Sequence, residues 1–257
     1  MPETGPAWSA QALAANPHAD AEKARKVQAM FAAIARRYDL NNRLHSFGQD
    51  QRWRRATVAA AGVGPGSRVL DVACGTGDLS EAFADAGASV VGVDFTPQML
   101  EIAAHKAAAH PARPGREAVR YEQGDAMALR FPDASFDAVS IAFGLRNVAD
   151  PARALAEFRR VLRPGGRLLV LEFAEPSNAL LRWGSNLYTH RIMPWTASWI
   201  ARDRSGAYHY LPRSVTTFLT PQDLQQAMQR AGFVGCASTP LTFGICAITR
   251  GQAPAAS

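Results

Sequence analysis

The sequence of 257 residues has few cysteines and no long apolar run, and each absence excludes a class of protein. Its three cysteines, Cys74, Cys236 and Cys246, form no Cys-x-x-Cys pair. We therefore expect neither a disulfide framework nor a metal site, and a reducing compartment is favoured. No stretch approaches the roughly 18 apolar residues that a membrane-spanning helix needs. The N-terminus has no basic segment followed by an apolar one, so no secretory signal is expected.

Acidic residues are outnumbered, with 28 Lys and Arg against 22 Asp and Glu, which gives a net charge of +6. The excess is concentrated in residues 22–55, which hold nine Lys or Arg against three acids. Such a segment suits a nucleic acid, an anionic membrane or an acidic ligand. For any single charge in it, a solvated helix face is the simpler interpretation.

The overall composition, 47% hydrophobic and 19% charged, fits one soluble α/β domain with an insertion. We expect residues 1–21 to be a disordered tail and 22–61 a helical lid. Residues 62–175 are the expected core, and 176–218 an insertion that faces substrate or membrane. Residues 219–251 are expected to return to the core, and 252–257 to form a second tail.

Strands and helices alternate from Arg68 onward. Apolar runs indicate strands over 68–73, 89–94, 118–125, 136–143, 168–173 and 241–250. Helical periodicity indicates helices over 23–38, 51–61, 78–87, 97–110, 148–162 and 220–233, and residues 39–48 are expected to be a loop. Alternation of this kind predicts parallel βαβ units and a sheet that is covered on both faces.

A glycine loop follows the first strand of this pattern. VLDVACGTGD (69–78) places Gly75, Thr76 and Gly77 between a strand and a helix, where open α/β sheets bind ligands. Ser80 replaces the third glycine of the dinucleotide fingerprint, and Asp71 closes the strand. A carboxylate there would face, and repel, the negative charge of a bound pyrophosphate, but it would suit a cationic ligand.

Two more carboxylates end the next strands. Asp94 lies 17 residues after Gly77, where a carboxylate can accept both ribose hydroxyls. Asp125 ends the third strand and is placed to take an adenine amino group. Each acid alone could be a helix cap or a surface charge. Together they indicate a nucleoside that carries positive charge instead of phosphates, which is S-adenosylmethionine.

Three longer stretches resemble the menaquinone/ubiquinone-biosynthesis C-methyltransferases, which are class I S-adenosylmethionine-dependent methyltransferases. They are FAAIARRYDLNNRLHSFGQDQRWRR (31–55), SIAFGLRNVADPARALAEFRRVLRPGGRLLVLEF (140–173) and AGFVGCASTPLTFGICAITRG (231–251). The resemblance covers about residues 25–251, and RYDLNN with FGLRNV is its most specific part. It implies a Rossmann-like α/β fold with a mostly parallel seven-stranded sheet, helices on both faces and an antiparallel C-terminal strand.

The resemblance also implies a reaction, the methylation of a ring carbon of demethylmenaquinol to give menaquinol. Some relatives act on the benzoquinol precursor of ubiquinone. We expect the cofactor site to be lined by the glycine loop and the three acids together with Phe95, Ala126 and Ala142. Substrate contacts are expected from Tyr38, Phe143, Tyr188 and Tyr208. The chain departs from the family at Ala142, where serine is usual, and at Pro212, which interrupts a helical stretch.

The loop after the fourth strand, FGLRN (143–147), carries the candidate catalytic residues. A hydroquinol becomes a carbon nucleophile when a hydroxyl ionises, which at pH 7 costs about 4 kcal/mol for a pKa near 10. We expect Arg146 to hold that oxygen, although an ion pair with Asp150 is the alternative. Asn147 could hold the second oxygen or cap the next helix. His190 is a candidate proton acceptor, as is His209.

The partners follow from the same resemblance. A prenylated quinol lives in the bilayer, and residues 182–204 mix aromatic, apolar and basic residues. We expect a cytoplasmic protein attached peripherally to the inner face of the membrane, although this segment could instead only cover the active site. A homodimer is left open.

The sequence is also compatible with three alternatives. One is another small-molecule substrate, and another is an adenosyl-binding protein without catalysis. The third is a nucleic-acid methyltransferase, suggested by the basic N-terminal segment and a pI near 9.6. Against the third, the fourth strand ends in AFGLRN rather than the Asp/Asn-Pro-Pro-Tyr/Phe motif of base-amino methylation. We therefore expect no nucleic-acid partner.

Overall fold

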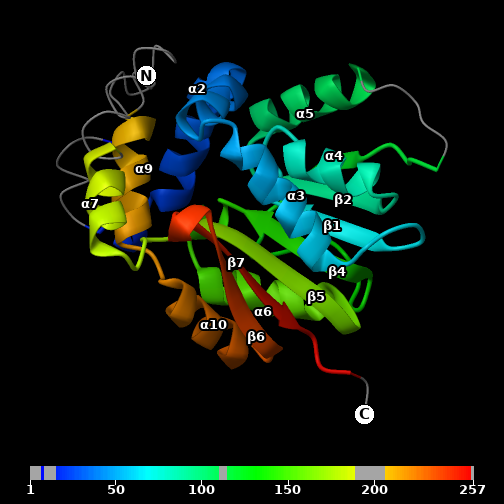
Figure 1. Cartoon of the computed structure of the whole chain (residues 1–257). Helices are drawn as coiled ribbons and strands as arrows, with labels where there is room; N and C mark the ends of the chain where they lie inside the picture. The colour runs from blue at the N-terminus through cyan, green and yellow to red at the C-terminus, as the bar shows by residue number, and fades with distance from the viewer. Residues whose placement is uncertain (1–6, 9–15, 110–114, 189–205, 256–257) are drawn as a thin grey trace.

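The computed structural model describes residues 7–8, 16–109, 115–188 and 206–255, and of Asn186, Tyr208 and His209 only the backbone. One seven-stranded sheet has the order β3-β2-β1-β4-β5-β7-β6 (Figure 1). Its strands are β1 (Arg68–Val72), β2 (Ser89–Asp94), β3 (Arg120–Gln123), β4 (Phe136–Ala142), β5 (Leu162–Phe173), β6 (Val234–Leu241) and β7 (Cys246–Gln252). Strands β1 to β5 pair in parallel, whereas β7 is antiparallel to β5 and β6. The predicted fold is confirmed.

Helices cover both faces of the sheet, because its central strands are apolar on both sides. On one face, α6 (Pro151–Val161) and α10 (Pro221–Arg230) bury Phe158 and Met228. On the other face, α3 (Gln49–Ala61) and α4 (Asp78–Asp85) bury Trp53 and Phe83. Helix α5 (Pro97–Ala109) packs against β2 and β3. Two apolar cores therefore hold the carboxyl ends of the strands in place.

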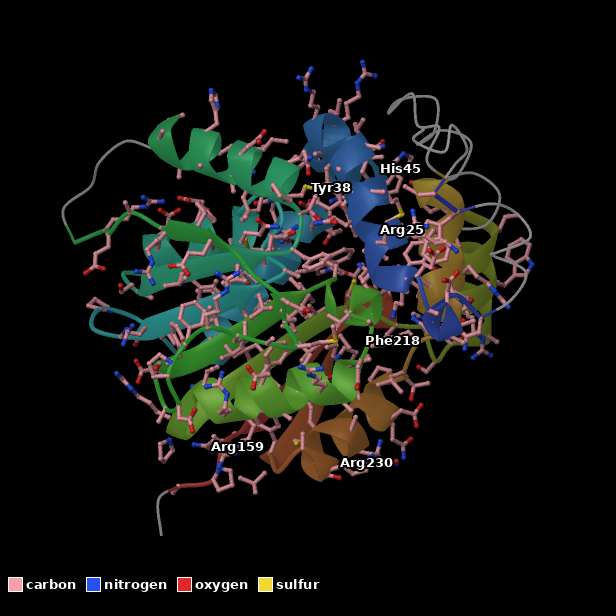
Figure 2. All side chains as sticks on the ribbon, turned by 180° about the vertical axis from the view of Figure 1, so that it is seen from behind. Arg25, Tyr38, His45, Arg159, Phe218 and Arg230 are labelled. Carbon is pink, nitrogen blue, oxygen red and sulfur yellow. The ribbon has the colours of Figure 1, made fainter. Side chains whose placement is uncertain are left out.

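A third apolar cluster lies above the carboxyl edge of the sheet. Helix α2 (Lys23–His45) packs between α5 and α9 (Ala207–Thr216), as Figure 2 shows from behind, with Tyr38 and His45 labelled on α2. Trp8 is buried there and stacks on Tyr210 with 4.5 Å between ring centroids. Helix α7 (Ala179–Leu187) lies beside α9 in Figure 1.

Residues 1–21 were expected to be disordered, and the structure differs at its described residues in that range. The short helix η1 (Pro17–Ala19) is capped by Asn16, whose side chain accepts from the His18 amide, and Pro17 is buried. Burial of a Trp side chain is worth a few kcal/mol, which can order a segment whose composition alone suggests a tail.

Element boundaries also differ from the expectation at three places. Helix α2 continues through the predicted loop to His45, because Asp39 binds Lys106 and Asn41 is buried. Tertiary contacts thus override the turn propensity of those residues. Strand β5 already begins at Leu162, before the Pro-Gly-Gly turn. The predicted tail begins inside β7, and Ala253 is buried with its amide donating to the Gly166 carbonyl at 2.8 Å.

Thr220 caps α10 in a capping box with Asp223, and Pro221 opens the helix as predicted. Pro212 lies inside α9.

Within the described residues, no helix is both long enough and apolar enough to cross a membrane.

Candidate active site

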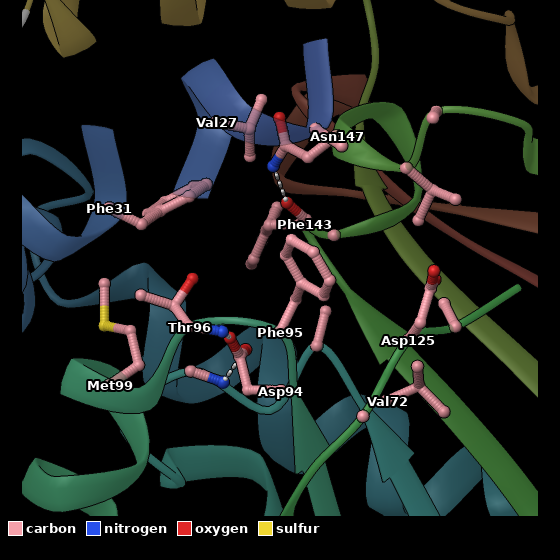
Figure 3. Close-up of a pocket in the computed structure, with 18 of the residues that line it drawn as sticks. Val27, Phe31, Val72, Asp94, Phe95, Thr96, Met99, Asp125, Phe143 and Asn147 are labelled. Carbon is pink, nitrogen blue, oxygen red and sulfur yellow. Dashed lines mark hydrogen bonds between the residues drawn. The ribbon is translucent and has the colours of Figure 1, made fainter. Parts of the chain in front are cut away.

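A cavity lies between α2 and the carboxyl edge of the sheet (Figure 3). The space between its walls is about 820 Å³, which includes a part that is open to solvent. Nine of the predicted site residues line it: Tyr38, Gly75, Asp94, Phe95, Asp125, Ala126, Ala142, Phe143 and Asn147. They come from four strand ends and from α2, which the parallel topology brings together.

Asp94 holds the glycine loop as well as lining the cavity. One carboxylate oxygen accepts from the Gly75 amide and the other from the Thr96 amide, both at 2.8 Å (Figure 3). Burial raises the pKa of this carboxyl, and these amides partly oppose the rise. A carboxylate has about four lone-pair sites and these two amides occupy two of them, so the predicted contact with hydroxyl groups stays compatible with them.

Asp71 is fully buried below the loop rather than on the wall of the main cavity. It accepts hydrogen bonds from the hydroxyls of Ser80 and Ser140, both at 2.6 Å. Burial raises the pKa of this carboxyl to about 6 although both hydroxyls lower it. The residue that replaces the third glycine, Ser80, therefore has a role, because it solvates Asp71.

Thr76 and Gly77 shape the loop from outside the main cavity. The Thr76 hydroxyl donates to Asp39 of α2. Gly77 has a φ of 85° and caps α4, and a Cβ at this position would collide with the Tyr121 hydroxyl. This glycine is required by backbone conformation and close packing. Neither residue lines the main cavity of the described structure.

A smaller side cavity adjoins the main one, and the two share Tyr38, Gly75 and Ala142 among their lining residues. One residue of the side cavity was not predicted from the sequence. Arg54 of α3 lines it and is 9% exposed. Its Nε is buried without a hydrogen-bond partner among the described residues, and its nearest carboxylate, Asp78, is 4.0 Å away. Arg54 is one of several basic residues in its segment, and the sequence offers no signal that separates it from its neighbours.

Arg146 occupies a different place from the one expected. It is 5% exposed and does not line the cavity formed by the described residues. One guanidinium nitrogen, Nη1, donates to Glu172 of β5 and to the Phe143 carbonyl, both at 2.7 Å. The alternative prediction, an ion pair between Arg146 and Asp150, is wrong, because Arg146 pairs with Glu172. A buried guanidinium needs a counter-charge, and the adjacent parallel strand supplies it.

Asn147 lines the cavity and does not cap the next helix. Asp150 is the cap of α6, accepting from the amides of Ala152 and Arg153. The Asn147 amide group donates to the Phe143 carbonyl, and its oxygen accepts from the Tyr210 hydroxyl at 3.0 Å. The expectation that Asn147 caps this helix was therefore wrong, and its side chain ties the loop to α9.

The remaining predicted residues are not brought to the cavity by the described structure. Tyr188 lies away from it, with its hydroxyl 2.9 Å from His45 Nδ1. Tyr208 and His209 fall in α9, but their side chains are outside the described part of the chain. His190 lies outside the described residues altogether.

Comparison with known proteins agrees with this architecture. The ubiE/COQ5 methyltransferase family matches residues 19–253. A demethylmenaquinone methyltransferase of Thermus thermophilus is 49% identical over 88% of this chain and 100% of its own. One of Deinococcus radiodurans is 46% identical over 90% and 94%. A ubiquinone/menaquinone biosynthesis C-methyltransferase of Teredinibacter turnerae is 42% identical over 90% and 92%.

Solved structures are similar at the level of the fold. A SAM-dependent methyltransferase from Aquifex aeolicus has a TM-score of 0.59 at 15% identity and covers 86% of this chain and 98% of its own. A phosphoethanolamine N-methyltransferase of Haemonchus contortus, solved with S-adenosyl-L-methionine, has a TM-score of 0.54 at 21% identity, covering 74% of this chain and 38% of its own. Sequence relatives and fold agree, and the chain belongs to the ubiE/COQ5 methyltransferase family.

Proposed function

We propose that this protein transfers a methyl group from S-adenosylmethionine to a ring carbon of demethylmenaquinol, giving menaquinol. The observation that carries the proposal is the cavity itself. It joins the glycine loop, with Asp94 and Asp125, to an apolar wall under α2. Relatives named for this activity match nearly the whole chain. Methylation of the benzoquinol precursor of ubiquinone is the second candidate, because the Teredinibacter relative is named for both quinones.

The residues present fit S-adenosylmethionine. Bound there, it supplies a methyl group on a positively charged sulfur. Asp94 would accept from the ribose hydroxyls, and Asp125 has a carboxylate at the cavity wall for the adenine amino group. Arg54 would meet the methionine carboxylate, which supplies a hydrogen-bond acceptor for the Nε that has none in the described structure.

Apolar and aromatic side chains suit the rest of the cavity to a quinol ring. Val27, Phe31 and Met127 line it together with Phe143, which packs on Phe173 with 4.6 Å between centroids. Loss of a hydroxyl proton places negative charge on the ring carbon beside that oxygen. The C–CH3 bond then forms as the S–CH3 bond breaks, and the ring carbon releases its hydrogen as a proton. Only the reduced ring has a hydroxyl to ionise.

In this proposal Arg146 is a positioning residue. It fixes the Phe143 carbonyl, and Asn147 binds the same carbonyl, so both hold the cavity wall against the ring. His190 stays the predicted proton acceptor. We further propose that the protein works in the cytoplasm at the membrane surface, on a prenylated quinol and not on nucleic acid, as a monomer or homodimer.

Methyl transfer to a short-chain demethylnaphthoquinol tests the proposal. We expect methylated product from the reduced ring, none from the oxidised quinone, and none from RNA under the same conditions. A benzoquinol run in parallel ranks the second candidate by kcat/KM. Methylation of RNA without methylation of either quinol would show that the proposed substrate class is wrong.

A further inference from the structure

A buried lysine lies directly behind the wall of the cavity. Lys23 begins α2 and is 2% exposed, and its Nζ donates to the Val148 carbonyl at 2.6 Å. Its neighbour Ala24 lines the cavity, as do Asn147, Val148 and Ala149. The ammonium therefore contacts the backbone of a residue that lines the space proposed for the quinol ring. Val27 and Asn147 face each other on the same side of this space (Figure 3).

The charges around Lys23 do not balance. Arg146 lies close enough to act on it, and Glu172 pairs with Arg146. From η1, His18 points its Nε2 at the Ser214 carbonyl, 3.0 Å away. From α9, Tyr210 contributes a hydroxyl that donates to Asn147. Glu172 thus pairs with one of two buried cations, Arg146, and no carboxylate of the described structure forms an ion pair with the other, Lys23.

An unpaired buried ammonium is costly, because burial removes its water. Burial, and then the nearby Arg146, lower the pKa of Lys23 to about 8. An anion bound beside it would offset that cost. In the proposed reaction the species that reacts is an anion, formed by loss of a hydroxyl proton in the adjacent cavity.

We propose that Lys23 is a positioning residue whose uncompensated charge, acting through the wall formed by residues 147–149, stabilises the ionised hydroxyl of the bound quinol. The inference rests on the proposed function. It assigns the charge that the reaction needs to α2 rather than to Arg146, whose charge Glu172 already balances. It follows that the lid helix and the chemistry are coupled, because α2 carries both the cavity wall and this charge.

Ionisation of a bound naphthol measures this effect without any methyl transfer. In 2-methyl-1-naphthol the carbon beside the hydroxyl is blocked, and its absorbance distinguishes naphthol from naphtholate. We expect wild type to bind it with an apparent pKa below that of the free compound. Lys23→Met should raise that pKa by at least one unit, and Lys23→Arg should restore most of the difference. The control is Lys26→Met on the same helix, whose ammonium is paired with Asp20, and it should behave as wild type.

Turnover supplies a second readout. At pH 7, Lys23→Met should methylate the demethylnaphthoquinol at least tenfold more slowly, with unchanged S-adenosylmethionine affinity by calorimetry. The two rates should converge above pH 8, where Lys23 loses its proton. Equal naphthol ionisation in wild type and Lys23→Met would overturn the inference. Inactivity of wild type on every quinol would instead reject the proposed function, while the naphthol measurement still decides the role of Lys23.

The thermal stability of Lys23→Met both checks that the variant folds and tests whether the ammonium is unpaired. Lys23 has a lowered pKa in the fold, so its protonated form destabilises the fold below pH 8, and this cost disappears as pH rises from about 8 to 10.5. Lys23→Met should therefore unfold at a higher temperature than wild type at pH 7, with the gap closing toward pH 10.5. A gap that does not change with pH would contradict the buried, unpaired ammonium and overturn the inference.

Discussion

At the scale of single residues, polar side chains near the cavity are fixed by partners from neighbouring strands and helices. Asp94 is held by two amides, and Asp71 by two serine hydroxyls. Arg146 and Glu172 form a buried pair between the loop after β4 and the end of β5. Breaking such a pair by removing one partner strands the other charge, which typically costs about 3–5 kcal/mol.

The contributions of the Arg146–Glu172 ion pair to stability and to catalysis can be measured separately. Arg146→Met should lower the free energy of unfolding by about 3–5 kcal/mol, because Glu172 is left buried and unpaired. Adding Glu172→Gln should restore most of that loss in urea denaturation. Turnover of the double variant should nevertheless stay depressed by on the order of 100-fold, because the Phe143 carbonyl has lost its Nη1 donor and the wall can shift.

The control for this pair is Arg163→Met, which breaks the more exposed ion pair with Asp137 at the other end of β4 and should cost under about 1 kcal/mol. If the double variant recovered both stability and turnover, Arg146 would serve folding alone. If S-adenosylmethionine affinity fell in proportion to turnover, the loop would belong to the cofactor site instead.

At the scale of elements, local signals predicted what local chemistry determines. Alternating strands and helices gave the sheet, and Thr220 with Pro221 gave the start of α10. Boundaries set by distant contacts were wrong. The extension of α2 to His45 depends on Lys106 and on the burial of Asn41, neither of which is visible in the residues of the loop itself.

The same division holds for the site. Asp94 and Asp125 were predictable because parallel strands bring their carboxyl ends to one edge. Lys23 and Arg54 were not, because their roles depend on how α2 and α3 pack over that edge. Periodicity shows that a helix has an apolar face, but it does not show which basic residue on the opposite side becomes buried.

Helix α3 makes a prediction of its own through Arg54. Arg54→Met should weaken binding of S-adenosylmethionine by about ten- to a hundred-fold, because a charge-assisted hydrogen bond contributes about 1.5–3 kcal/mol. Binding of decarboxylated S-adenosylmethionine should barely change, since this ligand lacks the group that Arg54 is proposed to meet. Calorimetry with both ligands measures the difference.

The matched control for Arg54 is Arg43→Met, whose side chain also approaches Asp78 but is 51% exposed. It should bind both ligands as wild type does. Equal losses for the two ligands in Arg54→Met would mean that Arg54 shapes the loop and does not recognise the carboxylate.

At the scale of the whole molecule, large apolar side chains are exposed on the C-terminal part of α2, on the turn after it and on α7. They include Phe47 at 78%, Leu180 at 75% and Trp183 at 65% exposed, with Leu40 and Leu44 on α2. Phe47 packs near Tyr188, 5.9 Å between centroids, which links the end of α2 to the end of α7. Exposed apolar groups gathered with basic residues suit the boundary of a bilayer.

We expect the protein to bind anionic vesicles and to bind neutral ones more weakly, because the chain has a net charge of +6 and each basic group near such a surface contributes about 1 kcal/mol. Binding should weaken as the salt concentration rises, since the Debye length, over which charges are felt, falls to about 3 Å at 1 M. Phe47→Ser with Trp183→Ser should lower the vesicle partition coefficient roughly 30-fold, because each aromatic side chain buried in the interface contributes on the order of 1 kcal/mol and the two together about 2 kcal/mol.

The control is Val234→Ser, which removes an apolar side chain that is 50% exposed from the edge strand β6 and should leave vesicle binding unchanged. Methylation of a water-soluble quinol should be the same in the double variant and wild type, whereas methylation of a long-chain quinol in vesicles should fall with binding. Equal sedimentation of wild type with anionic and neutral vesicles would remove the electrostatic part of the proposal. An unchanged double variant would place the contact on another surface, and the exposed side chains of α2 and α7 would then have no role in reaching the prenylated substrate.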